Sequence, residues 1–228
     1  MPDQRLLGLV TDSFWQILLP GLTVTVPLTA IAFSLAMVIA VAVALVQFAG
    51  LRVLRQLARF YIWVIRGTPF IVQLFFIYFG MAQLIQSLGA SNFSFTSFTA
   101  ATVTLTLNAG AYMSEIFRGG ISAVDKGQME AARSLGLPKK NAMAKIILPQ
   151  ALRICFPSLC NQCIITLKDS SLAQVIGLAE IVYRGKIYVA RTMQSFTTYA
   201  LIGIVYLIII SLLQWAAAVI ERRMNREP

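Results

Sequence analysis

Residues 17–46 read ILLPGLTVTVPLTAIAFSLAMVIAVAVALV, and no Asp, Glu, Lys or Arg occurs anywhere from Ser13 to Leu51. A helix needs about 20 consecutive apolar residues to cross a bilayer. The stretch is therefore predicted to span a membrane as one helix. Two further charge-free runs, from Gly67 to Ser114 and from Thr192 to Ile220, extend the pattern along the chain.

The composition agrees with a membrane protein, because 58% of the residues are hydrophobic and only 12% are charged. A soluble domain averages about 45–50% apolar and about 25% charged residues. The second run is long enough for two crossings, and a fourth apolar run, Ile154–Ala179, is interrupted only by Lys168 and Asp169. The prediction is an all-α integral membrane protein with five transmembrane helices, at about 17–46, 58–82, 96–118, 154–177 and 196–220.

The chain is predicted to divide into a short external segment at the membrane interface, residues 1–13, and one transmembrane domain, residues 14–228. The first apolar run is too long for the core of a signal peptide, which is about 7–15 residues. Short cytoplasmic loops retain Lys and Arg. Most basic residues lie at 52–59, at 118–153 and near the C-terminus. We therefore expect the N-terminus outside and the C-terminus in the cytoplasm.

The net charge of +10 and the absence of histidine narrow the chemistry further. The cations are spread over loops beside apolar spans, so attraction to anionic lipid explains them better than nucleic acid binding. Without histidine, a Ser-His-Asp triad and an H-E-x-x-H zinc site are excluded. No G-x-x-x-x-G-K-[ST] phosphate loop occurs. The chain is therefore predicted to have no catalytic residues and no cofactor of its own, and not to be an enzyme.

Cys160 and Cys163 have the C-x-x-C spacing of some metal and redox sites. They fall within a predicted span, and Cys155 is the only further thiol. A zinc tetrahedron needs four ligands. We therefore interpret the cysteines as small apolar residues in helix packing and predict no metal site.

The longest polar loop, at about 119–152, has its own helical pattern. A first short helix is predicted over Gln128–Leu135, begun by a capping box of Ser122 with Asp125 and stopped at Gly136. A second helix is expected from Pro138 to Leu148, where Pro149 ends or kinks it. The residues expected to form a small apolar knob on one face are Met129, Ala132 and Leu135. This helix pair either packs on the membrane helices of its own chain or docks on a cytoplasmic partner.

At this loop the sequence resembles the EAA loop of ABC importer permeases. The matching residues are Glu130, Ala131, Ala132, Gly136, Ile146, Leu148 and Pro149. The surrounding motifs resemble the polar amino acid branch of that family, the histidine and glutamine permease type. They are Arg66-Gly67-Thr68-Pro69 with Gln73-Leu74-Phe75, Ala111-Tyr112 with Glu115, Arg118-Gly119-Gly120-Ile121, Lys126-Gly127-Gln128, Leu148-Pro149-Gln150-Ala151 and Lys168-Asp169-Ser170-Ser171-Leu172.

The resemblance implies a transmembrane subunit paired with a second permease subunit, either another copy or a paralogue. It also implies an extracytoplasmic amino-acid-binding protein and a cytoplasmic ABC ATPase dimer that binds the ATP, in a bacterial cytoplasmic (inner) membrane. In such permeases the EAA loop is the coupling helix, seated in a groove of the ATPase. Ala131 and Ala132 would allow close approach there. Glu130 would meet a basic or amide partner.

Charged residues at membrane depth are costly and normally face a cavity or a partner. Lys168 and Asp169 are adjacent in a predicted span, so on a helix they point about 100° apart and do not simply neutralise each other. We expect one of them to face the translocation cavity, Asp169 toward a substrate amino group or Lys168 toward its carboxylate. Arg66 is a further candidate, because Gly67 and Pro69 interrupt the helix there.

Neutral hydrogen bonds to substrate are expected from Thr68, Asn108 and Tyr112. Glu115 is the last pathway candidate, although it is also well placed to pair with Arg118, three residues further along the same helix.

The predicted function is the transmembrane permease subunit of an ATP-driven ABC importer for polar amino acids, which forms the pathway and couples it to the ATPase. The alternative is a secondary transporter of amino acids driven by an ion gradient, and a scaffolding membrane protein would not explain the charges within the spans. The sequence does not name the amino acid: glutamine, cystine, histidine, arginine and opines all suit a cavity that offers both charges.

Overall fold

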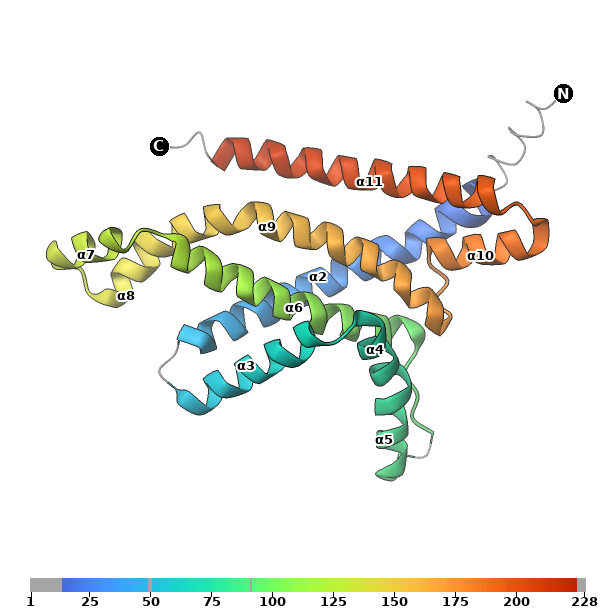
Figure 1. Cartoon of the computed structure of the whole chain (residues 1–228), viewed down its shortest axis with the longest axis horizontal. Helices are drawn as coiled ribbons and strands as arrows, with labels where there is room; N and C mark the ends of the chain where they lie inside the picture. Colours follow the sequence, from blue (N-terminus) through green and yellow to red (C-terminus); the bar gives the residue numbers. More distant parts are fainter. Residues whose placement is uncertain (1–13, 49–50, 91, 225–228) are drawn as a thin grey trace.

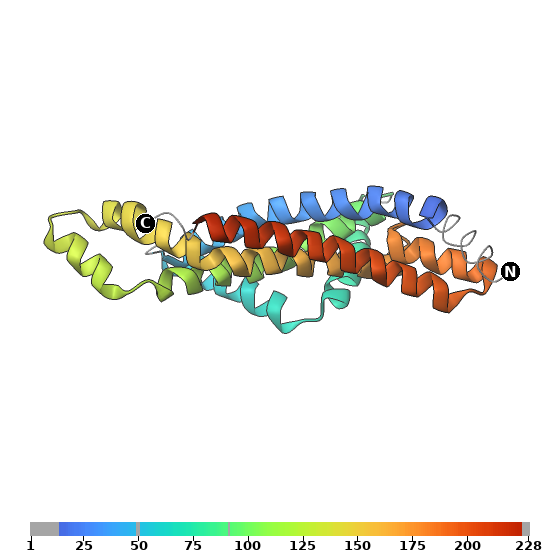
Figure 2. The same ribbon diagram turned by 90° about the horizontal axis from the view of Figure 1, so that it is seen from above.

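The computed structural model describes residues 14–48, 51–90 and 92–224, and every element in these ranges is helical (Figure 1). The longest helices are α2 (Leu19–Phe48), α6 (Ser97–Ala123), α9 (Leu148–Asp169) and α11 (Ser195–Met224). Figures 1 and 2 show all four running along the longest axis of the molecule. The segment 1–13, predicted to lie at the external interface, is outside the described residues.

Small side chains hold the bundle together. Ala36, Ala40 and Ala44 on α2 are buried in one cluster with Ala109 and Met113 on α6. Such residues let helix backbones approach closely, which is how helices associate where lipid removes the hydrophobic driving force. The α2–α6 pair is therefore the centre of the fold.

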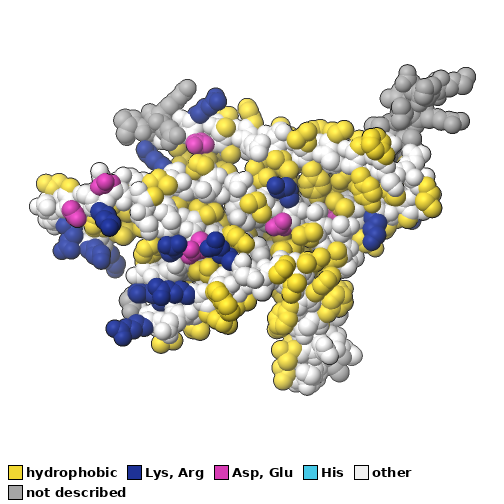
Figure 3. All heavy atoms as spheres, viewed as in Figure 1, with side chains coloured by type: hydrophobic (Ala, Val, Ile, Leu, Met, Phe, Trp, Pro, Cys, Tyr) yellow, Lys and Arg dark blue, Asp and Glu magenta, His cyan; other side chains and the backbone are white. Residues whose placement is uncertain are grey.

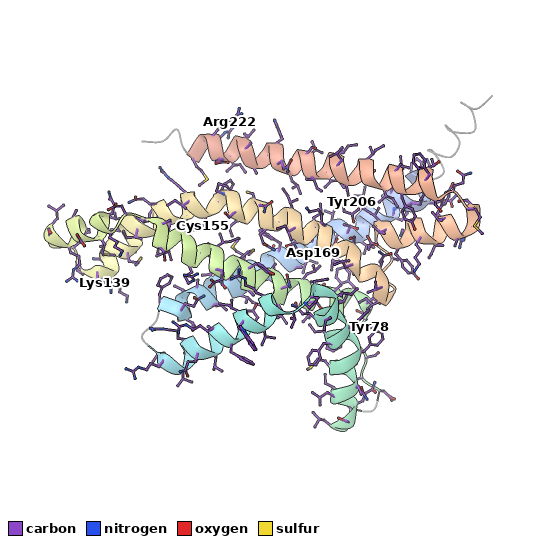
Figure 4. All side chains as sticks on the ribbon, in the orientation of Figure 1. Tyr78, Lys139, Cys155, Asp169, Tyr206 and Arg222 are labelled. Atoms are coloured by element: carbon purple, nitrogen blue, oxygen red, sulfur yellow. The ribbon has the colours of Figure 1, made fainter. Side chains whose placement is uncertain are left out.

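The contact between α6 and α9 depends on a glycine. A Cβ at Gly120 would overlap the Sγ of Cys155 and lie 3.1 Å from the Ala151 carbonyl oxygen. The Cys155 thiol is buried and donates to the Ile116 carbonyl at 3.3 Å; Figure 4 labels it on α9 beside α6. Cys155 therefore packs α9 against α6, at Gly120 and Ile116.

We expect Gly120→Ala to lower stability by about 1–3 kcal/mol, the usual cost of overpacking. The loss should be partly restored in the double variant Gly120→Ala with Cys155→Ala, because the second change removes the sulfur that the new methyl group overlaps. Thermal unfolding of the four proteins in detergent measures the coupling. Additive effects of the two changes would show that the helices do not meet here as described.

The second predicted span, 58–82, is not one continuous helix, and it is interrupted at Gly67–Pro69, where the sequence predicts the interruption. α3 (Arg52–Gly67) ends at Gly67, Thr68 and Pro69 are extended, and helix resumes as α4 (Phe70–Phe75), η2 (Phe76–Met81) and α5 (Ala82–Ser87). Figure 1 shows this second part projecting steeply away from α3. Proline has no N–H to donate and disfavours a helical conformation in the residue before it, which explains why the helix breaks here.

Four described segments are long and apolar enough to cross a membrane. They are Trp15–Phe48, Phe70–Ser87, Lys139–Ile176 and Ser195–Met224. The other long helix, α6, has 27 residues but includes Asn108, Glu115 and Arg118, which lower its hydropathy. The all-helical membrane fold is confirmed, whereas the predicted count of five spans is not exact.

The polar loop forms the hairpin that the sequence predicts at its first helix. Asp125 caps α7 (Lys126–Ser134) by accepting the Gly127 N–H, and Gly136 adopts a left-handed φ of 84° after its end. Ser122 instead belongs to the last turn of α6, so the capping box contains the aspartate alone. Figure 2 shows the hairpin at one end of the long axis.

The second loop helix does not end at Pro149. α8 (Lys139–Ala142), η3 (Met143–Ile147) and α9 follow one another without a break. η3 is a π-helical turn, wider than an α-helical one, and it ends two residues before Pro149. The wider turn accommodates the missing N–H, so one rod runs from the loop into the membrane segment.

The region between the last two predicted spans contains a helix that was not predicted from the sequence. η4 (Ser170–Ile176) ends at Gly177, and α10 (Ile181–Thr192) follows. Glu180 caps α10, accepting the N–H groups of Val182 at 2.9 Å and Tyr183 at 2.6 Å, and is fully buried. Figure 3 shows Lys and Arg gathered mainly at the opposite end, around α7, α8 and the start of α3.

Candidate functional site

The break between α3 and α4 is held by one buried glutamine. Gln73 Nε2 donates to the carbonyl oxygens of Ile65 at 2.7 Å and Thr68 at 3.0 Å, which the interrupted helix leaves without their usual partners. Its Oε1 accepts from Asn108 Nδ2 at 3.0 Å. An irregular backbone is thereby fixed against α6 in the interior of the molecule.

We expect Gln73→Leu to destabilise the protein. The change leaves the Ile65 and Thr68 carbonyl oxygens without the donor that Gln73 supplies, and the Asn108 amide without its acceptor. An unsatisfied buried polar group costs about 1–3 kcal/mol. Gln86→Leu is the matched control, since the Gln86 amide on α5 donates to the Phe93 carbonyl oxygen in an exposed position. Thermal unfolding should show a larger fall for Gln73→Leu; equal falls would contradict the assigned network.

A cavity of about 350 Å³ lies directly beside this break. We call it the central pocket. Its lining comes from α4, α6, α9 and the extended segment, and consists of Thr68, Pro69, Phe70, Asn108, Tyr112, Gln162, Ile165 and Asp169. Figure 4 labels Asp169 near the middle of the long axis. The pocket therefore combines one carboxylate with amide, hydroxyl and aromatic groups.

Asp169 supplies the one carboxylate in the lining of the central pocket. Among the described residues, no Lys or Arg nitrogen lies within 4 Å of it. It is the last residue of α9 and is half-buried. Lys168, its neighbour, is exposed and does not line the pocket. The carboxylate is thus the member of the pair that faces the cavity.

An ion cluster of Arg66, Glu115 and Arg118 lies next to the pocket. Glu115 accepts from Arg118 through both of its oxygens, with N–O distances of 2.8 to 3.1 Å. Arg66 Nη1 is 3.6 Å from the same carboxylate, and Gln47 donates to it at 3.4 Å. The Arg66 guanidinium also lies 5.4 Å from the centre of the Tyr112 ring, in the cation–π range.

The structure therefore sorts the pathway candidates into three places. Thr68, Asn108, Tyr112 and Asp169 share the central pocket; Arg66 and Glu115 form the ion cluster with Arg118; Lys168 lies outside both. The sequence reading missed Gln73 and Gln162. Each is a buried amide within a predicted span, and that signal could have drawn attention to them.

The three apolar residues predicted to share one face of the first loop helix do not all point the same way. Met129 packs against the cluster of Val124, Ile147 and Ala151 in the same chain, and Ala132 is buried. Leu135, which follows the end of α7, is 81% exposed. The expected single apolar knob is wrong, because the helix stops before Leu135 and that side chain leaves the common face.

The residues of the EAA pattern also divide into a buried or half-buried group and an exposed group. Ala132 is buried, and Ile146 and Leu148 are half-buried on the rod. Glu130, Ala131, Gly136 and Pro149 are exposed. The hairpin thus packs on its own chain through one side and leaves the other side free for a partner.

Comparisons with known proteins agree with this arrangement. Residues 33–226 match the family model described as a binding-protein-dependent transport system inner membrane component. The L-cystine transport system permease protein TcyB of Bacillus subtilis is 39% identical, with 96% of this chain and 91% of that protein covered. The arginine transport system permease protein ArtQ of the same bacterium is 34% identical, with 91% and 92% covered.

A solved structure gives the same result for the fold. A chain in a crystal structure of an amino acid ABC transporter with histidines superposes with a TM-score of 0.87 and 35% identity. The match covers 94% of this chain and 97% of the other. This chain therefore has the fold of that chain over nearly the whole length of both.

Proposed function

The chain belongs to the binding-protein-dependent transport system inner membrane components, as a permease subunit of an amino acid ABC importer, and from this premise we propose that its central pocket binds a polar amino acid during import. The unpaired Asp169 carboxylate in that pocket is the observation that carries the proposal. The relatives named above are permeases of ABC importers, and none of them supports an ion-gradient-driven transporter.

The pocket suits the α-amino group that all candidate substrates share. Asp169 would accept an ammonium group in a charge-assisted hydrogen bond, the stronger class of hydrogen bond. The hydroxyl of Thr68 and the amides of Asn108 and Gln162 would orient the rest of the molecule. We assign the amino group to Asp169 rather than the carboxylate to Lys168, because the lysine does not line the pocket.

The relatives transport different amino acids by name, cystine and arginine. Both carry an α-ammonium and an α-carboxylate, so the common part of the substrate is what the pocket must recognise. We propose that the substrate is a polar amino acid and that an extracytoplasmic binding protein selects it. Titrating that binding protein with glutamine, cystine, histidine, arginine and an opine would identify it.

We propose that the exposed side of the α7 hairpin contacts a cytoplasmic ATPase dimer, which binds the ATP. This places the hairpin and the C-terminus in the cytoplasm and the start of α2 outside, in a bacterial inner membrane. The permease would pair with a second subunit, either another copy or a paralogue. The basic side chains around the hairpin favour this orientation, since cytoplasmic loops retain Lys and Arg.

The function is tested by reconstituting the chain in liposomes with its candidate ATPase and binding protein, with and without a candidate paralogue. We expect the loaded binding protein to stimulate ATP hydrolysis and uptake to require ATP. Ionophores that dissipate proton and sodium gradients should leave uptake unchanged. Uptake that persists without ATP and stops with ionophores would contradict the proposal.

A further inference from the structure

A second cavity shares a wall with the central pocket. It has a volume of about 340 Å³, and we call it the inner chamber. Its lining is Arg66, Tyr112, Glu115, Ile116, Arg118 and Gln162. Tyr112 and Gln162 also line the central pocket, so these two side chains stand between the cavities.

The two cavities follow one another along the helices. On α6, Asn108 lines the central pocket, Tyr112 lines both cavities, and Glu115 lines the inner chamber but not the central pocket. On α9, Gln162 lines both cavities, whereas Asp169 lines only the central pocket. In both helices the residues of the inner chamber are those nearer the α7 hairpin. Seven residues separate Asn108 from Glu115 on α6 and Gln162 from Asp169 on α9, which is about 10 Å along each helix at a rise of about 1.5 Å per residue.

A third cavity continues in the same direction. It has a volume of about 320 Å³ and shares Glu115 and Arg118 with the inner chamber. Arg59 contributes a further cation to its lining. The three cavities thus form a series from Asp169 toward the hairpin end, and positive side chains outnumber negative ones along the second and third.

The two arginines of the inner chamber are not equally engaged. Arg118 makes a two-pronged contact with Glu115 at 2.8 to 3.1 Å. Arg66 reaches the same carboxylate only at 3.6 Å, and its side chain is 46% exposed. One carboxylate cannot neutralise both guanidinium groups, so Arg66 retains positive charge and free N–H donors that face the chamber. A second carboxylate could bind it through both oxygens.

We propose that the inner chamber is a second station on the substrate path, where Arg66 binds the α-carboxylate of the amino acid after it passes the wall of Tyr112 and Gln162. This inference rests on the proposed function. The first station holds the ammonium group at Asp169, and the second holds the opposite charge. A zwitterion therefore leaves each station by exchanging one charge contact for the other, which keeps it from being trapped by both at once.

Arg66→Gln and Arg66→Lys test the second station in the reconstituted importer. Arg66→Gln removes the guanidinium group of the second station and should leave co-purification of the ATPase unchanged. The same variant should lower the uptake rate at least tenfold. Arg66→Lys retains the charge and should recover uptake to within about threefold of wild type. Arg222→Gln, an exposed cation on α11, is the matched control for loss of charge.

The wall is tested in complexes held by a non-hydrolysable ATP analogue in liposomes preloaded with the amino acid. Tyr112→Ala joins the two cavities and should raise passive efflux at least tenfold, whereas Tyr112→Phe keeps the ring and should not. If Tyr112→Ala does not assemble, Gln162→Ala removes the other half of the wall and should leak in the same assay.

Unchanged uptake in Arg66→Gln, no recovery of uptake in Arg66→Lys, or equal efflux from the alanine and phenylalanine variants would overturn the second station. Wild-type uptake remains the reference for the proposed function. Failure of the wild type would count against the importer itself, and failure of the variants alone counts only against the station.

Discussion

Asp169→Asn should reduce amino acid uptake by about 10- to 100-fold while the importer still assembles. Hydrogen bonds to charged groups contribute about 1.5–3 kcal/mol, and each 1.4 kcal/mol corresponds to a factor of ten. The amide keeps the shape of the side chain but loses the charge that would meet the substrate ammonium group. Uptake by the reconstituted importer is the measurement, with co-purification of the ATPase as the check on assembly.

Two companion variants sharpen this result. Lys168→Gln separates the two assignments of the adjacent pair, because the exposed lysine should change uptake by less than about twofold if Asp169 binds the substrate. Asp169→Glu keeps the charge but moves it by one methylene, and uptake should lie between the wild type and Asp169→Asn. Wild-type uptake in Asp169→Asn, or a larger loss in Lys168→Gln, would reverse the assignment.

Ala131→Trp should abolish association with the ATPase, with a complete loss of ATP-dependent uptake. Ala131 is exposed on α7 while its neighbour Ala132 is buried against the protein's own rod. A large ring at Ala131 would therefore hold the partner surface away without disturbing the interior of the hairpin. Co-purification of the ATPase and stimulation of ATP hydrolysis by the binding protein measure the effect.

The control for this change is Ala123→Trp, an exposed alanine at the end of α6 outside the EAA pattern. It should retain ATPase association. Glu130→Gln should weaken association less than Ala131→Trp, because it removes a charge but adds no bulk. ATPase recovered equally with the Ala131 and Ala123 variants would mean that another surface carries the contact.

The sequence was sufficient to predict the parts of the fold that depend on local chemistry. The charge-free runs predicted the long membrane helices, and Asp125 and Gly136 correctly marked the limits of α7. Helix continuity was harder to predict. Pro69, which follows Gly67 and Thr68, breaks a helix as the sequence predicts, whereas Pro149, which follows Ile147 and Leu148, does not. The π-helical turn before Pro149 determines that difference, and no residue pattern announces it.

Part of the candidate site could also be predicted from the sequence. Ionisable residues within apolar runs drew attention to Asp169, Arg66 and Glu115, since their burial has a cost. Their sorting into two cavities depends on how α3, α6 and α9 cross, which composition does not encode. Gln73 and Gln162 were missed because amides are less costly than charges at membrane depth, yet Gln73 holds the broken segment and Gln162 separates the cavities.

The continuous helical rod from Lys139 to Asp169 connects the hairpin to the Asp169 carboxylate of the central pocket. At about 1.5 Å per residue the rod is roughly 45 Å long, so a tilt of about 5° would displace one end by about 4 Å relative to the other. The hairpin and Asp169 lie at opposite ends of this lever. If the proposed ATPase rotates the hairpin, this helix would carry the motion to the Asp169 carboxylate, through the π-helical turn before Pro149 and past Pro157 within α9.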